Sequence, residues 1–223
     1  TSHIVELFDQ AKGRLLILGE PGTGKSTMLL ILARALLMRA RKPSAPIPVV
    51  CNLVTWSREQ KPIGEWIERE LITKYFVRTN IAPKWVAQDQ LVLLLDGLDE
   101  VSEEDRIRCC EALNDYLNAH PVQIAICCRI NEFTKLGQKL CLIHAIEIQP
   151  LIEAQLFRYL HTLRLEKELS PYLILPEDAS SQFMLSPLMV NTIIRTYDDG
   201  KNQGRLSRIS LATTTVEFYS ELF

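Results

Sequence analysis

Residues 19–27, Gly-Glu-Pro-Gly-Thr-Gly-Lys-Ser-Thr, are the segment whose residue types and spacing most clearly predict chemistry. The segment matches the pattern G-x-x-x-x-G-K-[ST] at every fixed position. Its glycines allow backbone N–H groups to approach a polyphosphate, because they adopt conformations that other residues rarely take. Lys25 would place its charge on the phosphates, and the Ser26 hydroxyl would ligate Mg²⁺. The residues expected to bind nucleotide are Gly19, Glu20, Pro21, Gly22, Thr23, Gly24, Lys25, Ser26 and Thr27.

A second chemical signal is the acidic segment 96–100, Asp-Gly-Leu-Asp-Glu, which follows the apolar run Leu91–Leu95. An apolar strand that ends in an acid is typical of a Walker B motif, in which Asp96 would hold Mg²⁺ directly or through water. Asp99 and Glu100 follow closely enough to orient or deprotonate an attacking water molecule. Between these two acids we favour Glu100 as the base because its side chain reaches further.

Arg129 provides the third signal, because it directly follows another apolar run, Ile124–Cys128. If this run forms a strand beside those that lead to the phosphate loop and to Asp96, the guanidinium would sense the terminal phosphate. An arginine that only ends a strand at the protein surface explains the same sequence equally well. The residues alone leave both interpretations open.

The elements that must position these side chains are short apolar strands alternating with helices. A strand over 15–18 and a helix over about 25–41 flank the phosphate loop, as the motif requires. Further strands are expected over 47–53, 91–95, 122–128 and 145–148, with helices over 62–75, 83–88 and 102–118 and a short one from 131. This alternation predicts an α/β fold with three layers, in which helices cover both faces of a parallel sheet.

The spacing of the motifs also indicates a branch of the P-loop NTPases. Between Lys25 and Asp96 there is room for an extra strand and helix, whereas one helix separates Asp96 from Arg129. This arrangement fits the branch with an added strand and a catalytic glutamate, and it does not fit kinases or GTPases. No Asn-Lys-x-Asp guanine signature occurs, which favours ATP or ADP, with Mg²⁺, as the ligand.

The sequence changes character near Pro150, where strand patterns give way to helical ones. We expect a helical lead-in over 1–13, a nucleotide-binding α/β domain over 14–149 and an all-helical domain over 150–223, truncated at its C-terminal end. The helical patterns in the last of these cover 151–165, 187–197 and 212–223.

The composition of the 223 residues is ordinary for a globular protein, with 47% hydrophobic and 23% charged residues. A formal net charge of −2 gives no electrostatic reason to expect nucleic acid or an anionic membrane as a partner. The six cysteines show neither C-x-x-C nor zinc-ligand spacing, which favours a reducing, cytoplasmic setting. The most apolar stretch, 28–38, is too short to span a bilayer.

Three segments together resemble the NACHT family of signal-transducing NTPases of the STAND class, in the form found in bacterial multidomain proteins. These segments are 19–27, 93–101 and 128–133, and the Asp-Gly-Leu-Asp-Glu sequence is the most specific part of them. The segment 147–157 is similar to the one that enters the helical domain of the family. Leu185-Ser-Pro187-Leu188 is similar to the segment whose proline lies against the adenine.

The resemblance implies a role for each site residue: Lys25 on the phosphates, Ser26 and Asp96 on magnesium, Glu100 or Asp99 at the water, Arg129 as sensor and Pro187 near the base. It implies slow ATP hydrolysis and a switch between a closed monomer and an oligomer, in which nucleotide exchange or hydrolysis biases the two states. It also implies a longer protein that carries sensor and effector domains. One departure is Cys128-Arg129-Ile130, where family members often have Ser-Arg-Pro. A motor ATPase of the AAA type and a scaffold that binds nucleotide without hydrolysis are the alternative functions.

Overall fold

The computed structural model describes residues 3–42, 44–137, 140–149, 151, 153–162, 165, 186–188, 190, 192, 194 and 195. The chain divides into two compact units, Thr1–Ile148 and Gln149–Phe223. The assignment of a nucleotide-binding domain to residues 14–149 and of an all-helical domain to residues 150–223 stays a prediction. Among the described residues, none of the helices combines the length and apolar character needed to cross a bilayer.

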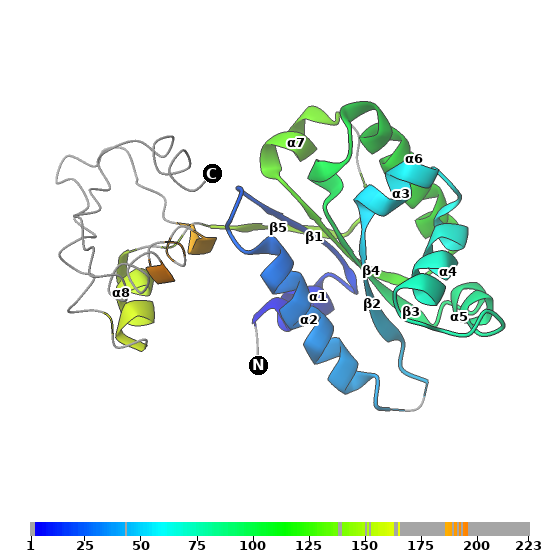
Figure 1. Cartoon of the computed structure of the whole chain (residues 1–223), viewed down its shortest axis with the longest axis horizontal. Coiled ribbons are helices and arrows are strands. Elements are labelled where there is room, and N and C mark those ends of the chain that lie inside the picture. The colour runs from blue at the N-terminus through cyan, green and yellow to red at the C-terminus, as the bar shows by residue number, and fades with distance from the viewer. Residues whose placement is uncertain are drawn as a thin grey trace. The chain divides into compact units, whose positions relative to one another are not determined.

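A parallel sheet forms the centre of the first unit (Figure 1). Within the described residues its five strands lie in the order β2-β3-β4-β1-β5. They are β1 (Arg14–Gly19), β2 (Ile47–Asn52), β3 (Leu91–Asp96), β4 (Gln123–Cys128) and β5 (His144–Ile148). Because β4 lies between β1 and β3, the phosphate-loop strand and the acidic strand are not adjacent, and the predicted added-strand arrangement is confirmed.

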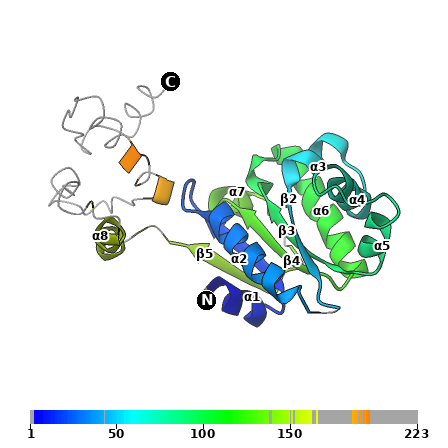
Figure 2. The ribbon, with the colours of Figure 1, turned by 60° about the horizontal axis from the view of Figure 1, so that its bottom comes forward.

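Helices cover both faces of this sheet (Figure 2). The helices of the first unit are α1 (His3–Gln10), α2 (Lys25–Arg39), α3 (Leu53–Glu59), α4 (Ile63–Thr73), α5 (Ala82–Ala87), α6 (Glu103–Ala119) and α7 (Ile130–Lys135). A 3-10 turn, η1 (Leu98–Glu100), joins β3 to the segment that enters α6. The three-layer α/β fold expected from the sequence is therefore present.

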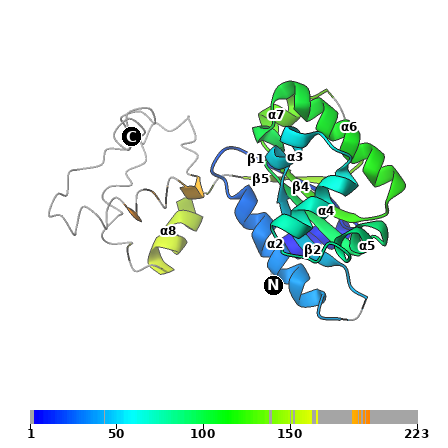
Figure 3. The same ribbon diagram turned by 45° about the vertical axis from the view of Figure 1, so that its right-hand side comes forward.

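Successive side chains of β1, β2, β3 and β4 enter two separate hydrophobic cores, one on each face of the sheet. In β3, Leu93 and Leu95 belong to the core beneath α3 to α6, whereas Val92 and Leu94 belong to the core beneath α1 and α2. Figure 3 shows α3, α4 and α6 gathered over one side of the sheet. Burial on both faces explains why β3 is apolar throughout until it ends at Asp96.

Local signals set several helix boundaries. Ser102 caps α6, since its Oγ accepts a hydrogen bond from the backbone N–H of Asp105 at 3.3 Å. The sequence did not predict α3, which follows β2 directly and ends that strand at Asn52 rather than at Leu53. The Asn52 Oδ1 caps α3 by accepting from the N–H of Val54 at 2.8 Å.

In the second unit, helix α8 covers Glu153–Thr162, inside the predicted helical segment 151–165. The described residues between 187 and 195 are helical as well. The helix predicted over 212–223 lies outside the described residues.

Candidate nucleotide-binding site

The phosphate loop connects the end of β1 to the start of α2, at the carboxyl edge of the sheet. Gly24 is the N-cap of α2 and has a φ of 95°, a left-handed conformation that strains any residue with a Cβ. It supplies no side-chain cap to the helix. The first N–H groups of this 15-residue helix therefore remain available for an anion, and the helix dipole favours negative charge there.

Lys25 lies across the loop that precedes it. Its Nζ donates hydrogen bonds to the carbonyl oxygens of Gly19 at 2.9 Å and of Glu20 at 3.1 Å. An ammonium group has three donors, so these two bonds leave one for a phosphate oxygen. The two carbonyls thus hold the Lys25 ammonium group against the phosphate loop, and its contact with phosphate stays a prediction.

Thr23 and Cys127 stabilise the phosphate loop from within the protein. Thr23 is buried, and its Oγ1 donates to the carbonyl of Glu20 at 2.8 Å, so its side chain fixes the loop's shape. The thiol of Cys127, at the end of β4, donates to the carbonyl of Lys25 over 3.7 Å. Burial raises the pKa of the Cys127 thiol and keeps it neutral. Cys127 is therefore a small, buried side chain of the core.

The other predicted nucleotide-binding and metal residues lie along the same edge of the sheet. Pro21 and Gly22 belong to the turn, and Ser26 and Thr27 are exposed in the first turn of α2. Asp96 is the last residue of β3 and is half-buried, and its Oδ1 accepts from the following N–H at 3.0 Å. The hydroxyl of Ser26 and the carboxylate of Asp96 are hard oxygen donors, which suit Mg²⁺.

Asp99 and Glu100 are adjacent in the sequence but have different surroundings. The Asp99 carboxylate is only 7% exposed, and it is bound on both oxygens by Arg129: Oδ2 by Nε at 2.7 Å and Oδ1 by the backbone N–H at 3.2 Å. Glu100 is exposed, and its Oε2 lies 3.5 Å from the amide Nδ2 of Asn52. Asp99 is thus buried and bound by Arg129, whereas the Glu100 carboxylate is exposed; the assignment of Glu100 as the base stays a prediction.

Gly97 makes room for this arrangement. It has a φ of 76°, and a Cβ at this position would lie 3.0 Å from the Asn52 Oδ1 and 3.0 Å from the Glu100 Oε2. A side chain here would push the amide and the carboxylate apart. The turn into η1 therefore requires glycine both for its backbone conformation and for the space above it.

Sequence reasoning did not identify Asn52 as a site residue. In the parallel register of β2 and β3 it is paired with Asp96, so the sheet places it at the same edge. Its position as the last polar residue of a predicted strand was the signal that was available. The amide of Asn52 both caps α3 and faces Glu100, which connects the two elements.

Pro187 is the one predicted site residue that falls in the second unit. It is helical and half-buried there. Its contact with the adenine stays a prediction.

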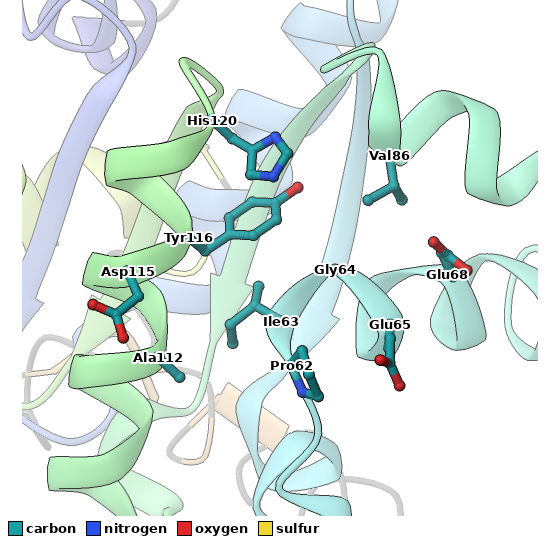
Figure 4. A pocket seen from close by; sticks show the side chains of 10 residues that line it. All are labelled: Pro62, Ile63, Gly64, Glu65, Glu68, Val86, Ala112, Asp115, Tyr116 and His120. Atoms are coloured by element: carbon teal, nitrogen blue, oxygen red, sulfur yellow. The ribbon is translucent and has the colours of Figure 1, made fainter.

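A pocket of about 460 Å³ lies elsewhere in the first unit, between α4, α5 and α6 (Figure 4). The stacked rings of Tyr116 and His120, 4.4 Å apart between centroids, form part of its wall. None of the residues predicted to bind nucleotide lines it. Its lining residues are Pro62, Ile63, Gly64, Glu65, Glu68, Val86, Ala112, Asp115, Tyr116 and His120.

The fold and the phosphate loop together define a P-loop NTPase of the α/β class. A family model described as NACHT domain matches residues 14–166, and the chain belongs to this family. Membership makes the chain a nucleotide-binding NTPase module. Comparison with curated protein sequences gave no match.

Two solved structures share this fold. One is the Aeropyrum pernix ORC1 protein in complex with DNA, with a TM-score of 0.56 and 13% identity over 96% of this chain. The other is AMPPCP-bound DnaA from Aquifex aeolicus, with a TM-score of 0.51 and 15% identity over 98% of this chain. The alignments cover 63% of the ORC1 chain and 65% of the DnaA chain. At this identity the likeness concerns the fold alone.

The contact between Asp99 and Arg129 predicts that Asp99 contributes to stability, whereas Glu100 acts as the base. We expect Asp99→Asn to lower the free energy of unfolding by about 1–2 kcal/mol, since it removes the charge of a buried carboxylate whose partner is half-exposed. Thermal denaturation measures this loss, and Asp115→Asn, at an exposed position on α6, is the control. An Asp99→Asn protein with unchanged stability and no ATP turnover would instead identify Asp99 as the base.

Proposed function

We propose that this chain is the nucleotide switch of a larger signalling protein. It binds ATP or ADP with Mg²⁺, hydrolyses ATP slowly, and uses the bound nucleotide to control self-association. The observation that carries this proposal is the ion pair between Arg129 and Asp99, which joins the predicted phosphate sensor to the turn that bears the predicted base. A change at the terminal phosphate that moves Arg129 would therefore act on the turn that holds Glu100, the predicted base.

In this proposal the phosphate loop recognises the nucleotide through backbone and charge. The N–H groups at the start of α2 bind phosphate oxygens, and Lys25 turns its free donor to them while it keeps the carbonyls of Gly19 and Glu20. Ser26 and Asp96 would hold Mg²⁺, whose charge neutralises the phosphates when it is bound. The AMPPCP carried by the DnaA structure supports an adenine nucleotide as the ligand.

Glu100 acts on the water in this mechanism. Its exposed carboxylate accepts a proton from the attacking water molecule, while the amide of Asn52 holds one of its oxygens. Arg129, held by Asp99, offers positive charge to the oxygens of the transferred phosphoryl group. Each of these residues lies at the carboxyl end of a strand or shortly after it, which is where parallel α/β sheets place their ligands.

The test of this function is the nucleotide that the purified protein carries. The protein is denatured, and the released nucleotide is identified by ion-exchange chromatography. We expect stoichiometric ADP, because a switch that hydrolyses slowly retains its product. An empty site together with fast steady ATP turnover would support a motor instead, and GDP would overturn the choice of adenine.

A second measurement tests the proposed self-association. Analytical size exclusion with ADP and with a non-hydrolysable ATP analogue should give a small and a large species, respectively, when the full-length protein is used. The same elution volume with both nucleotides would contradict a role as an oligomerisation switch. The nucleotide-binding part of the proposal would still rest on the chromatography of released nucleotide.

A further inference from the structure

Arg106 on α6 is a buried cation that the functions assigned so far do not use. Its side chain is 6% exposed. A guanidinium is seldom buried to this extent, because removing its charge from water is costly unless every donor finds a good acceptor. The contacts of this side chain therefore indicate what it does.

Three of these contacts go to the backbone of residues 97–101, the turn after β3 that bears Asp99 and Glu100 and is called the acidic turn below. The Nε of Arg106 donates to the carbonyl of Leu98 at 3.1 Å, and Nη2 donates to the carbonyls of Asp99 at 3.0 Å and Val101 at 2.8 Å. The residue between the last two is Glu100. Arg106 thus fixes the backbone on both sides of the predicted base. It does so through main-chain carbonyls, and the Glu100 carboxylate stays exposed.

The fourth contact goes to α7. Nη1 of Arg106 forms an ion pair with Oε2 of Glu132 at 2.7 Å. Lys135 reaches the other oxygen of this carboxylate at 3.3 Å. The hydrogen bonds from Arg106 and Lys135 hold the pKa of Glu132 below its usual range, which extends the charged state of this carboxylate to more acidic pH.

A second ion pair joins the acidic turn to the start of α7. Arg129, the N-cap of α7, binds the carboxylate of Asp99 in the acidic turn. Arg106 on α6 therefore binds Glu132 on α7, and Arg129 at the start of α7 binds Asp99 in the acidic turn. Together they join the turn after β3 to the start of α7.

We propose that Arg106 is a positioning residue that holds Glu100 in place and couples the acidic turn to α7. The role in hydrolysis rests on the proposed function above. When Arg129 moves with the state of the phosphate, α7 and the acidic turn move as one body, and Glu100 follows. The planar guanidinium is required because its donors point to four acceptors in fixed directions, whereas a lysine offers three donors from a single point.

The coupling is tested first by hydrogen exchange in the nucleotide-free protein. In Arg106→Lys we expect the backbone amides of residues 97–101 and of 129–135 to exchange about tenfold faster or more, because both segments lose the bonds that hold them. Arg108→Lys is the matched control, since Arg108 lies on the same helix with a side chain that is 60% exposed. In the control both segments should exchange at the wild-type rate.

The role in hydrolysis is tested by separating turnover from affinity. We expect Arg106→Lys to lower kcat for ATP by about tenfold to 100-fold, since small misplacements of a catalytic group have effects of this size. The Kd for ADP should change by less than about threefold, because the phosphate loop is untouched. Glu132→Gln, which keeps the three carbonyl contacts, should accelerate exchange in 129–135 more than in 97–101 and lower kcat less.

If Arg106→Lys does not fold, Glu132→Gln alone tests whether Arg106 couples the acidic turn to α7. Wild-type exchange rates in both segments of either folded variant would overturn the coupling. A parallel loss of kcat and ADP affinity would overturn the positioning role and assign Arg106 to general stability. If the wild-type protein binds nucleotide without hydrolysing it, the proposed function fails, and the exchange rates still determine whether Arg106 joins the two segments.

Discussion

Replacement of Lys25 by alanine should weaken nucleotide binding by about 100-fold or more, which corresponds to about 2.7 kcal/mol. The side chain provides the one cation that the structure places within the phosphate loop, where Nζ is already held by the carbonyls of Gly19 and Glu20. Charge-assisted hydrogen bonds to phosphate contribute about 1.5–3 kcal/mol each. Losing one or two of them accounts for the expected change.

Isothermal titration calorimetry with ADP and Mg²⁺ measures this effect directly. Lys84→Ala provides a matched control, since Lys84 is exposed on α5 and lies outside the predicted site. The melting temperatures without nucleotide should agree between Lys25→Ala and the wild type, because the lysine contacts only two carbonyls of its own loop. An affinity within threefold of the wild type would show that the loop is not the phosphate site.

Glu100→Gln should abolish turnover, with kcat lowered by about 100-fold or more, while ADP affinity stays unchanged. Glutamine has nearly the shape of glutamate and fits beside Asn52, but its amide does not accept a proton from water. The phosphate loop and Asp96 keep their charges, so binding should persist. Phosphate release under single-turnover conditions measures the rate of the chemical step.

Glu104→Gln is the control for this substitution, because Glu104 is an exposed acid in the first turn of α6. It should hydrolyse ATP at the wild-type rate. If Glu100→Gln has the same rate as the wild type, Glu100 is not the base. A rate at background in both proteins would indicate a scaffold that binds nucleotide, and a measurable rate in both would indicate Asp99 as the base. The Asp99→Asn protein separates these two outcomes, since Asp99 is expected to act mainly through stability.

The phosphate loop and the fold class were predictable because they depend on local features. The glycines in 19–27 mark backbone conformations that few other residues tolerate, so their spacing describes the loop's shape directly. Runs such as Leu91–Leu95 are apolar because both faces of a central parallel strand are covered. The order of motifs along the chain then predicted the added strand, and the sheet confirms it.

The element that the sequence analysis missed illustrates how tertiary contacts override local patterns. The segment of α3, Leu53–Glu59, is too short to display a helical period, and it continues from a strand without a turn. Its helical form depends on the Asn52 cap and on burial of Leu53 and Trp56 against the core. The first of these signals is weak in isolation, and the second exists only in the folded protein.

The sequence by itself determined the class of site: a phosphate loop, an acidic strand end and an arginine at the next strand end. Between Asp99 and Glu100 it offered only the longer reach of the glutamate side chain as a reason to favour Glu100 as the base. In the tertiary structure the surroundings of the two acids differ: Arg129, thirty positions away, binds Asp99 because β3 and β4 are neighbours in the sheet, whereas Glu100 is exposed. Arg106 likewise looks like a surface residue of a helix, and only the packing of α6 against the acidic turn and α7 buries it. Ion pairs between distant segments depend on strand order and helix packing, which emerge only when the whole chain has folded.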